Sequence, residues 1–505
     1  MSTVQEALRD ESPCPKKHKT LPHSPNHPQR ILPPLSELPL SLHGIALHVS
    51  ALVTTAAQTL SKEHADAARE STFEFLGSED PDVVARYTPV YAAAQLLYAQ
   101  SCYHEAIALT QTDSQDKNSA VVALDECLRA VDLTILRTNI GEWSAVAKPL
   151  LREAESLRSS ISALCSDDHY NASIGATDTH TCTTGMDGTV KSSSIIPSYF
   201  LKDDENASEV PRIDIGQVSI ETFISDYMSS SPSPSPVIIC GAISSWPALN
   251  KWSNIEYLKS KAAGRLVPVE TYDKKDATQT YLTDTWEQQV MSFGDFVDNY
   301  IVSAGGPESE EEERGYLAQY QLFEQIPSLM NDIEVPSLCS AVTEEDSSAP
   351  LNSESTPPAS PLVSAWFGPK GTVSPLHNDP YHNLLAQVVG SKYLRLYQAS
   401  DTELVYPREG PMCNNSYINL DTIIDNPNES KKFPRFREAK FQHCILKPGE
   451  LLYIPRHYWH YVRSLEMSFS SSFWWGAKMA LQRVVAKDSK GKGGKDKDVK
   501  YVACY

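Results

Sequence analysis

The chain has 505 residues, a hydrophobic share of 41% and a formal net charge of -20 at pH 7. This length predicts two or three domains. The acidic balance argues against general binding to the phosphate backbone of nucleic acids, which depends on Lys and Arg, and it leaves a basic protein or peptide as a suitable partner. No stretch reaches the roughly 20 apolar residues that cross a bilayer, and the start shows no secretory leader. The sequence therefore predicts neither sequence-specific nucleic-acid binding nor a membrane protein.

The first 195 residues fall into three parts. Residues 1–40 are rich in Pro, His, Lys and Ser without periodicity, which predicts disorder, and residues 166–195 have the composition of a linker. Residues 41–165 are predicted to form a helical domain. The basic cluster at 16–19 is either surface or a nuclear signal, and the ten cysteines lack a C-x-x-C pair, which favours reduced thiols. We therefore expect the protein in the nucleus, the cytoplasm or both.

The helical prediction depends on apolar spacing. In the segment 119–136, apolar residues fall on one face of a helix: Val121, Leu124, Leu128, Val131 and Ile135. The charged residues of the same segment are predicted to face away: Asp125, Glu126, Arg129 and Asp132. The segments 92–109 and 146–164 show similar patterns. Because no fixed-period repeat is visible, a helical bundle is the simpler prediction, and a repeat-like peptide-binding array is the alternative.

From about residue 196, short β-type runs divided by turn residues replace the helices. The main runs are VIICGAISSWPALNKW, RLVPVETY, TYLTDTW, SAWFG, NLLAQVV, KYLRLY, CILKPGELLYI and HYVRSL. Such a series predicts a β-sandwich or barrel and not a parallel α/β sheet. Two inserts, at 305–314 and 343–360, are predicted to be solvated loops, and the Lys-rich tail 481–505 is predicted to be disordered. The fold class is therefore α+β and multidomain.

One stretch of the β region carries residues that suit a metal ion. His377 and Asp379 stand one residue apart at the start of an apolar segment, and alternate residues of a strand share a face. A third ligand is expected from the distant segment KPGELLYIPRHYWHYVRSL, where His460 opens a strand and His457 lies in the preceding loop. Two His and one carboxylate that leave coordination positions open are typical of non-haem Fe(II) oxygenases.

The same stretch predicts a co-substrate site. Gly390 and Ser391 are interpreted as a two-residue hairpin turn, which would place Lys392 on the face that carries Asn383. A buried Lys needs a counter-charge, and buried polar groups need partners. A metal ion together with an anionic co-substrate would meet both needs.

These segments, together with PVIICGAISSWPALNKW, GYLAQYQLF and SAWFGPKGTVSPLHNDPYHN, resemble the JmjC domain. This family consists of Fe(II)- and 2-oxoglutarate-dependent oxygenases with a double-stranded β-helix. The resemblance covers residues 196–480 with specific motifs, and the helical region resembles a small JmjC group only loosely. It implies iron ligands at His377, Asp379 and His460. It implies contacts to 2-oxoglutarate from Tyr316, Ser374, Asn383 and Lys392. It implies substrate contacts from Glu270, Trp366 and Trp474.

The resemblance also implies the chemistry. With Fe(II), 2-oxoglutarate and dioxygen, such a site hydroxylates a methylene group or removes an N-methyl group through an unstable hemiaminal, and the motif does not choose between the two. We expect a protein or peptide substrate with a basic side chain, arginine favoured, and histone lysine demethylation is the alternative. Further alternatives are a catalytically silent binding scaffold and a different metal cupin such as a sugar isomerase. Glu270 is alternatively a surface carboxylate, and His382 and His443 are predicted to be structural.

Overall fold

The computed structural model describes most of the helical region and of the β region. The described residues are 53–56, 59, 61–76, 78, 81–111, 117–138, 141–170, 206–229, 234–273, 282, 286–302, 313–347, 360–423 and 426–476. The predicted disordered start, residues 171–195 of the predicted linker and the predicted Lys-rich tail lie outside them. None of the described helices combines the length and apolar character needed to cross a membrane.

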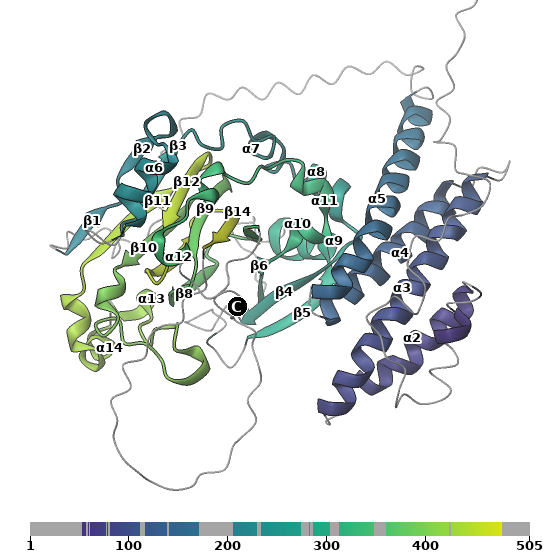
Figure 1. Ribbon diagram of the computed structural model, residues 1–505, viewed down its shortest axis with the longest axis horizontal. Coiled ribbons are helices and arrows are strands. Elements are labelled where there is room, and N and C mark those ends of the chain that lie inside the picture. The colour runs from purple at the N-terminus through teal and green to yellow at the C-terminus, as the bar shows by residue number, and fades with distance from the viewer. Residues whose placement is uncertain are drawn as a thin grey trace, which may run out of the picture.

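Long helices form the N-terminal part of the described chain (Figure 1). They are α2 (Lys62–Leu76), α3 (Pro81–Gln111), α4 (Lys117–Thr138) and α5 (Gly141–Tyr170). Each packs on the next one along the chain, and their small and apolar side chains form one buried cluster. The predicted helical segments are therefore confirmed, and α5 continues five residues past the predicted boundary at residue 165.

The second part is built from two β-sheets. The five-stranded sheet has the order β1-β11-β10-β13-β8, and the nine-stranded sheet has the order β2-β3-β12-β9-β14-β7-β6-β4-β5. The strands are β1 (Ala207–Glu209), β2 (Arg212–Asp214), β3 (Val237–Cys240), β4 (Leu266–Asp273), β5 (Glu287–Ser292), β6 (Glu313–Tyr320), β7 (Leu362–Gly368), β8 (Val373–His377), β9 (His382–Val389), β10 (Lys392–Tyr397), β11 (Phe441–Leu446), β12 (Glu450–Ile454), β13 (Trp459–Ser464) and β14 (Ser468–Trp475). Most neighbours run antiparallel, which confirms the predicted α+β class with a sandwich of two sheets.

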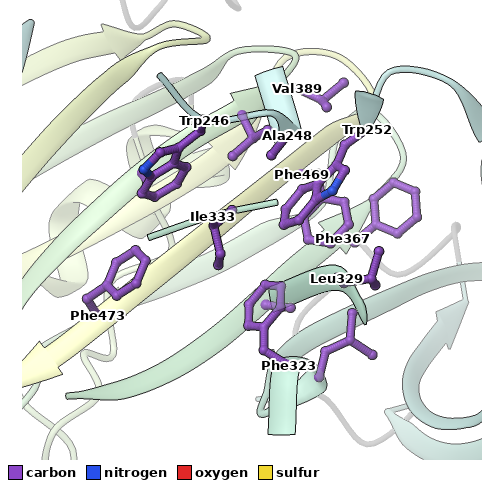
Figure 2. Close-up of a cluster of buried hydrophobic side chains, with 14 of the residues drawn as sticks. Trp246, Ala248, Trp252, Phe323, Leu329, Ile333, Phe367, Val389, Phe469 and Phe473 are labelled. Carbon is purple, nitrogen blue, oxygen red and sulfur yellow. The ribbon is translucent and has the colours of Figure 1, made fainter. Parts of the chain in front are cut away.

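Short helices cover parts of this β domain. They are α6 (Ile220–Phe223), α7 (Ala248–Lys251), α8 (Ile255–Ala262), α9 (Phe293–Phe296), α10 (Leu322–Gln325), α11 (Pro327–Met330), α12 (Glu344–Ser347), α13 (Leu420–Ile423) and α14 (Pro427–Lys432). Figure 2 shows the core on one side of the nine-stranded sheet, where the aromatic rings of Trp252, Phe367 and Phe469 lie together. The ring centroids of Phe367 and Phe469 are 4.7 Å apart.

The pleat of the nine-stranded sheet separates this core from a polar interior. On β7, Phe367 joins the core while its neighbour Trp366 lines a cavity on the other face. On β9, Leu384 joins the core while Asn383 lines the cavity. Side chains of a strand point alternately to its two faces, so the same strands form the hydrophobic core and one wall of the cavity.

The predicted hairpin between β9 and β10 is wrong. The strand β9 pairs with β12 and β14, whereas β10 pairs with β11 and β13 in the other sheet. The turn between them therefore carries the chain from one sheet to the other. Gly390 has a φ of +67°, and a Cβ atom there would lie 2.0 Å from the carbonyl oxygen of Met467. Only glycine fits this close approach.

Three further expectations need correction. His377 ends β8 instead of opening a strand, and Asp379 lies in the connection to β9. The insert at 343–360 is not solvated throughout, because Asp346 in α12 is buried and accepts a hydrogen bond of 2.8 Å from Nη1 of Arg456. Within the predicted strand TYLTDTW, Leu282 lies in a turn, and β5 begins only after Trp286.

Candidate active site

A cavity between the two sheets holds most of the predicted site residues. Its walls include Tyr316, Trp366, Ser374, His377, Asp379, Asn383, Lys392 and His460. The remaining wall is apolar and comes from Leu385, Ile454 and Val462, which the sequence analysis did not single out. Their alternation with core residues on β9 and β12 was the available signal. The cavity therefore combines an apolar wall with a concentrated set of polar groups, as ligand sites do.

Three of these residues form a candidate metal centre. One ligand atom each of His377, Asp379 and His460 can be chosen so that all three atoms lie within 4.8 Å of one another, and all three residues are buried. The Nε2 atom of His460 is 3.5 Å from a carboxylate oxygen of Asp379, and that of His377 is 4.0 Å from the other oxygen. Two imidazoles and one carboxylate around one point are the donor set typical of non-haem iron.

Strand pairing and a β-bulge bring these residues together. His377 on β8 is directly opposite His460 on β13, and Ser374 is opposite Val462. Three steps along β8 therefore match two steps along β13, which is the signature of a bulge. Because of the extra residue, Ser374 and His377 both reach the cavity although they are an odd number of positions apart.

Backbone carbonyl groups orient both imidazole rings. Nδ1 of His377 is 2.7 Å from the carbonyl oxygen of Pro375, and Nδ1 of His460 is 2.9 Å from that of Tyr458. A carbonyl oxygen only accepts, so each Nδ1 carries the proton and each Nε2 presents a lone pair. Burial, followed by the charge of His460, lowers the pKa of His377 to about 4. The ring of His377 is therefore neutral at pH 7, as a metal ligand has to be.

Asp379 is the anionic member of this set. Burial alone would raise its pKa, but the interactions with His460 and the other nearby histidines outweigh burial and lower the pKa. The backbone N–H of His457 also donates to the carbonyl oxygen of Asp379 at 2.8 Å. The carboxylate is therefore ionised at neutral pH. The hydrogen bond from His457 connects the loop of Asp379 to the turn before β13.

Lys392 supplies a buried ammonium group on the cavity wall. The residue is 2% exposed, and Nζ is 3.4 Å from the hydroxyl oxygen of Tyr316. Among the described residues, no carboxylate lies within ion-pair distance of this ammonium group. Burial lowers the pKa of Lys392 to about 7. A buried cation without a counter-charge is costly, so the cavity is suited to an anionic ligand.

Asn383 and Trp474 offer further unpaired polar atoms. They are directly opposite each other on β9 and β14, so their side chains lie on one face. The side-chain oxygen of Asn383 and the indole N–H of Trp474 are both buried and have no hydrogen-bond partner in the described chain. Trp474 is not part of the cavity wall itself; its ring stacks at 5.9 Å on the ring of Tyr381.

Glu270 lies on β4, next to the cavity. Its direct partner on β6 is Tyr316, so the two side chains share a face of the sheet. Burial raises the pKa of Glu270 to about 7, and the nearby indole of Trp286 partly offsets this effect. No cationic side chain of the described chain forms an ion pair with it. Glu270 is therefore a half-buried carboxylate without a counter-charge among the described residues, and it is not a fully exposed surface carboxylate.

The other site residues considered in the sequence are Trp366 and the histidines outside the candidate metal centre. The indole N–H of Trp366 donates to Oγ of Ser472 at 2.9 Å, which fixes the ring at the cavity. His382 is buried, but its Nδ1 lies 2.8 Å from the hydroxyl oxygen of Tyr453, away from the candidate ligands. His443 pairs with Arg395 on the neighbouring strand. His457 has a φ of +62° and lies in the turn before β13.

This set of residues fits Fe(II) and 2-oxoglutarate. His377, Asp379 and His460 would hold the metal ion, and Lys392 with Tyr316 would hold the far carboxylate of the co-substrate. The bound pair would supply oxidative chemistry on a C–H bond of a substrate. The chain itself contributes three buried donors, a positive charge 3.4 Å from a hydroxyl group, and an apolar wall.

The titration of Lys392 predicts how co-substrate binding depends on pH. Below about pH 7 the ammonium group is already charged, so the affinity for 2-oxoglutarate should be constant there. Above pH 7, binding has to take up a proton, so we expect the affinity to weaken by up to about tenfold per pH unit. Anaerobic calorimetry with the Mn²⁺-loaded protein from pH 6 to 9 measures this. Lys392→Met is the control and should lack the dependence; a flat profile in the wild type would contradict the prediction.

Comparison with known proteins agrees with this geometry. The profile of the family described as cupin-like domain matches residues 221–480. Lysine-specific demethylase 8 of Danio rerio is 43% identical over 269 residues, which cover 53% of this chain and 58% of the relative. Lysine-specific demethylase 8 of Xenopus tropicalis is 40% identical over 257 residues, 51% of each chain. Lysine-specific demethylase JMJ30 of Arabidopsis thaliana is 41% identical over 259 residues, covering 51% of this chain and 53% of the relative.

These matches define the class of the protein. The chain belongs to the family with a cupin-like domain, and this domain is of the JmjC type, as the motifs predicted. The matched region spans about half the length of the curated relatives.

Proposed function

We propose that the protein is an Fe(II)- and 2-oxoglutarate-dependent oxygenase that hydroxylates a basic side chain of a protein, with arginine favoured. The observation that carries the oxygenase proposal is the pairing, in one cavity, of the His377, Asp379 and His460 cluster with a buried Lys392 that has no counter-charge. A binding scaffold would have no use for a buried, unpaired ammonium group beside three converging ligand atoms. A sugar isomerase would not need the anion site.

The preference for arginine depends on Glu270 and Trp366. Glu270 is half-buried without an ion-pair partner in the described chain, and it lies on the same face as Tyr316. The rings of Tyr316 and Trp366 have centroids 6.2 Å apart. A planar guanidinium can form two hydrogen bonds with a carboxylate and stack on an indole. A trimethylated lysine cannot donate such bonds.

Lysine demethylation is the second candidate. It is favoured by the relatives at 40–43% identity, whose names describe lysine-specific demethylases. It would use the same candidate iron centre, with an N-methyl group in place of a methylene group, and its protein substrates would include histones. A nuclear location would suit it.

One experiment separates the two candidates. The full-length protein is incubated with Fe(II), 2-oxoglutarate and two matched peptides, one with arginine and one with methylated lysine at the same position. Mass spectrometry then detects a gain of one oxygen on arginine or the loss of a methyl group from lysine. Turnover of methyl-lysine alone would replace the arginine proposal, and the absence of succinate with either peptide and without peptide would overturn the oxygenase proposal.

Replacing the Glu270 carboxylate tests the arginine subsite. In Glu270→Gln, the shape is kept but the charge is lost, so we expect kcat/KM for the arginine peptide to fall by about ten- to a hundredfold, the value of hydrogen bonds to a charged group. Peptide-independent conversion of 2-oxoglutarate to succinate should remain. Glu287→Gln on the neighbouring strand β5 is the matched control, because Glu287 is exposed and is opposite Thr271. Equal peptide kinetics in both variants would refute the role of Glu270.

A further inference from the structure

A buried guanidinium joins the helical part of the chain to the β domain. Arg265, directly before β4, is 3% exposed. Its Nε and Nη2 donate to the carboxylate of Asp132 on α4, at 2.9 Å and 2.5 Å. Its Nη1 donates to Glu155 on α5 at 2.6 Å, and its Nη2 also donates to the carbonyl oxygen of Gln325 at 2.7 Å. One side chain therefore connects two helices of one domain with two elements of the other.

Asp132 is the central acceptor of this junction. It was predicted to face away from the apolar side of its helix, and its exposed fraction is 0%. Besides binding Arg265, it accepts a hydrogen bond of 2.9 Å from the backbone N–H of Leu266, the first residue of β4. The carbonyl oxygen of Leu266 accepts a hydrogen bond of 2.6 Å from the side chain of Gln325. The backbone N–H and carbonyl groups of Leu266 are therefore both hydrogen-bonded to side chains, one of which, Asp132, belongs to the helical domain.

Apolar contacts accompany the charges. Leu136 on α4 packs against the hydrophobic core of the β domain, and α4 contacts β4 directly (Figure 1). A buried ion pair costs free energy when one partner leaves, because the other charge stays behind in a low dielectric. The two domains are thus joined at the start of β4, and a second ion pair, between Lys148 on α5 and Glu324 on α10, also connects them.

The strand β4 leads from this junction to Glu270. Four residue steps along the strand lead from Leu266 to Glu270, which corresponds to about 13 Å. By contrast, the candidate metal ligands and Lys392 lie on or beside β8, β10 and β13 in the five-stranded sheet. A disturbance at the start of β4 should therefore reach Glu270 but leave the three candidate metal ligands and Lys392 in place.

We propose that Asp132 and Glu155, acting through Arg265, are positioning residues for Glu270, the carboxylate proposed to bind the basic side chain of the substrate. The helical domain then sets the position of β4, the strand whose Glu270 binds the basic side chain, and does not act as a separate module. This inference depends on the proposed function only in the role of Glu270; the junction itself can be tested without catalysis.

The test uses the full-length protein with Asp132→Asn, which keeps the shape and removes the charge. Asp125→Asn is the matched control, since Asp125 is on the same helix but pairs with Arg158 at 2.6 Å inside the helical domain. We expect the KM for the arginine peptide to rise about tenfold in Asp132→Asn, with the KM for 2-oxoglutarate changed less than twofold. Hydrogen exchange of the β4 amides should speed up, with β8 and β13 unchanged. Asp125→Asn should show none of these changes.

A second variant covers a failure to fold. Asp132→Leu combined with Arg265→Met leaves no unpaired charge of this pair, and it should fold and show the same selective changes. Unchanged β4 exchange and peptide KM in either folded variant would overturn the proposal, as would a joint rise of both KM values with faster exchange in both sheets. If the wild type hydroxylates no arginine peptide, the proposed function fails. The role of the junction in holding β4 is then tested by hydrogen exchange alone, as a faster rate in β4 but not in β8 or β13 of the variants.

Discussion

Replacing either histidine of the candidate metal centre with alanine should abolish succinate formation. His377→Ala or His460→Ala removes one of the three buried ligand atoms that lie within 4.8 Å of one another. Only two protein donors to the metal ion then remain. Both residues are at the cavity and outside the apolar core clusters, so the circular dichroism spectrum should stay that of the wild type. Succinate release by mass spectrometry and iron content by elemental analysis measure the effect, and both should fall to background.

His457→Ala is the control for this prediction. His457 is three residues from His460. Its backbone N–H donates to the carbonyl oxygen of Asp379 at 2.8 Å, and alanine keeps that group. Its Nδ1 is buried without a partner in the described chain, so removing the ring breaks no hydrogen bond of that atom. We expect near wild-type activity. An inactive His457→Ala together with an active His460→Ala would show that the distal ligand is wrongly chosen.

The polar wall of the cavity could be predicted from the sequence to the extent that it follows strand alternation. Trp366 beside Phe367 and Asn383 beside Leu384 show the period of two, and each pair divides between the cavity and the core. This pattern is local, because it depends only on the pleat of one strand. It is robust for the same reason.

Pairing between strands could not be predicted in this way. His377 and Asp379 do converge, but through a bulge in β8 and the connection after it and not by alternation on one strand. Lys392 does reach the cavity wall, but the turn at Gly390 connects two sheets and forms no hairpin. A glycine with positive φ suits either kind of turn, so the sequence of the turn does not choose the partner strand.

Contacts between domains leave even less trace in the sequence. The periodicity of the segment 119–136 correctly identifies the side of α4 that packs on other helices, with Leu124 and Leu128 buried. It cannot show that a second domain covers the opposite side. The burial of Asp132 on that side was therefore not predicted, because it depends on contacts with Arg265, which is 133 positions away in the sequence.

Lys392→Ala should separate co-substrate binding from metal binding. The side chain is on β10, and its ammonium group contacts Tyr316, with no carboxylate of the described chain in ion-pair range. Without it, the far carboxylate of 2-oxoglutarate would be buried with no cation to offset its desolvation. Loss of a hydrogen bond to a charged group costs about 2–3 kcal/mol, so we expect the KM for 2-oxoglutarate to rise on the order of a hundredfold.

The iron content of Lys392→Ala should match that of the wild type, because none of the three candidate ligands is changed. Lys370→Ala is the matched control: Lys370 is an exposed lysine in the turn after β7, and its removal should leave the KM unchanged. Since the buried ammonium group in the free protein has no counter-charge, Lys392→Met, which keeps most of the side-chain volume, should unfold at a temperature no lower than the wild type without ligand. An unchanged KM would mean that the carboxylate binds elsewhere, and a loss of iron with the KM effect would mean that Lys392 supports the metal centre instead of the co-substrate.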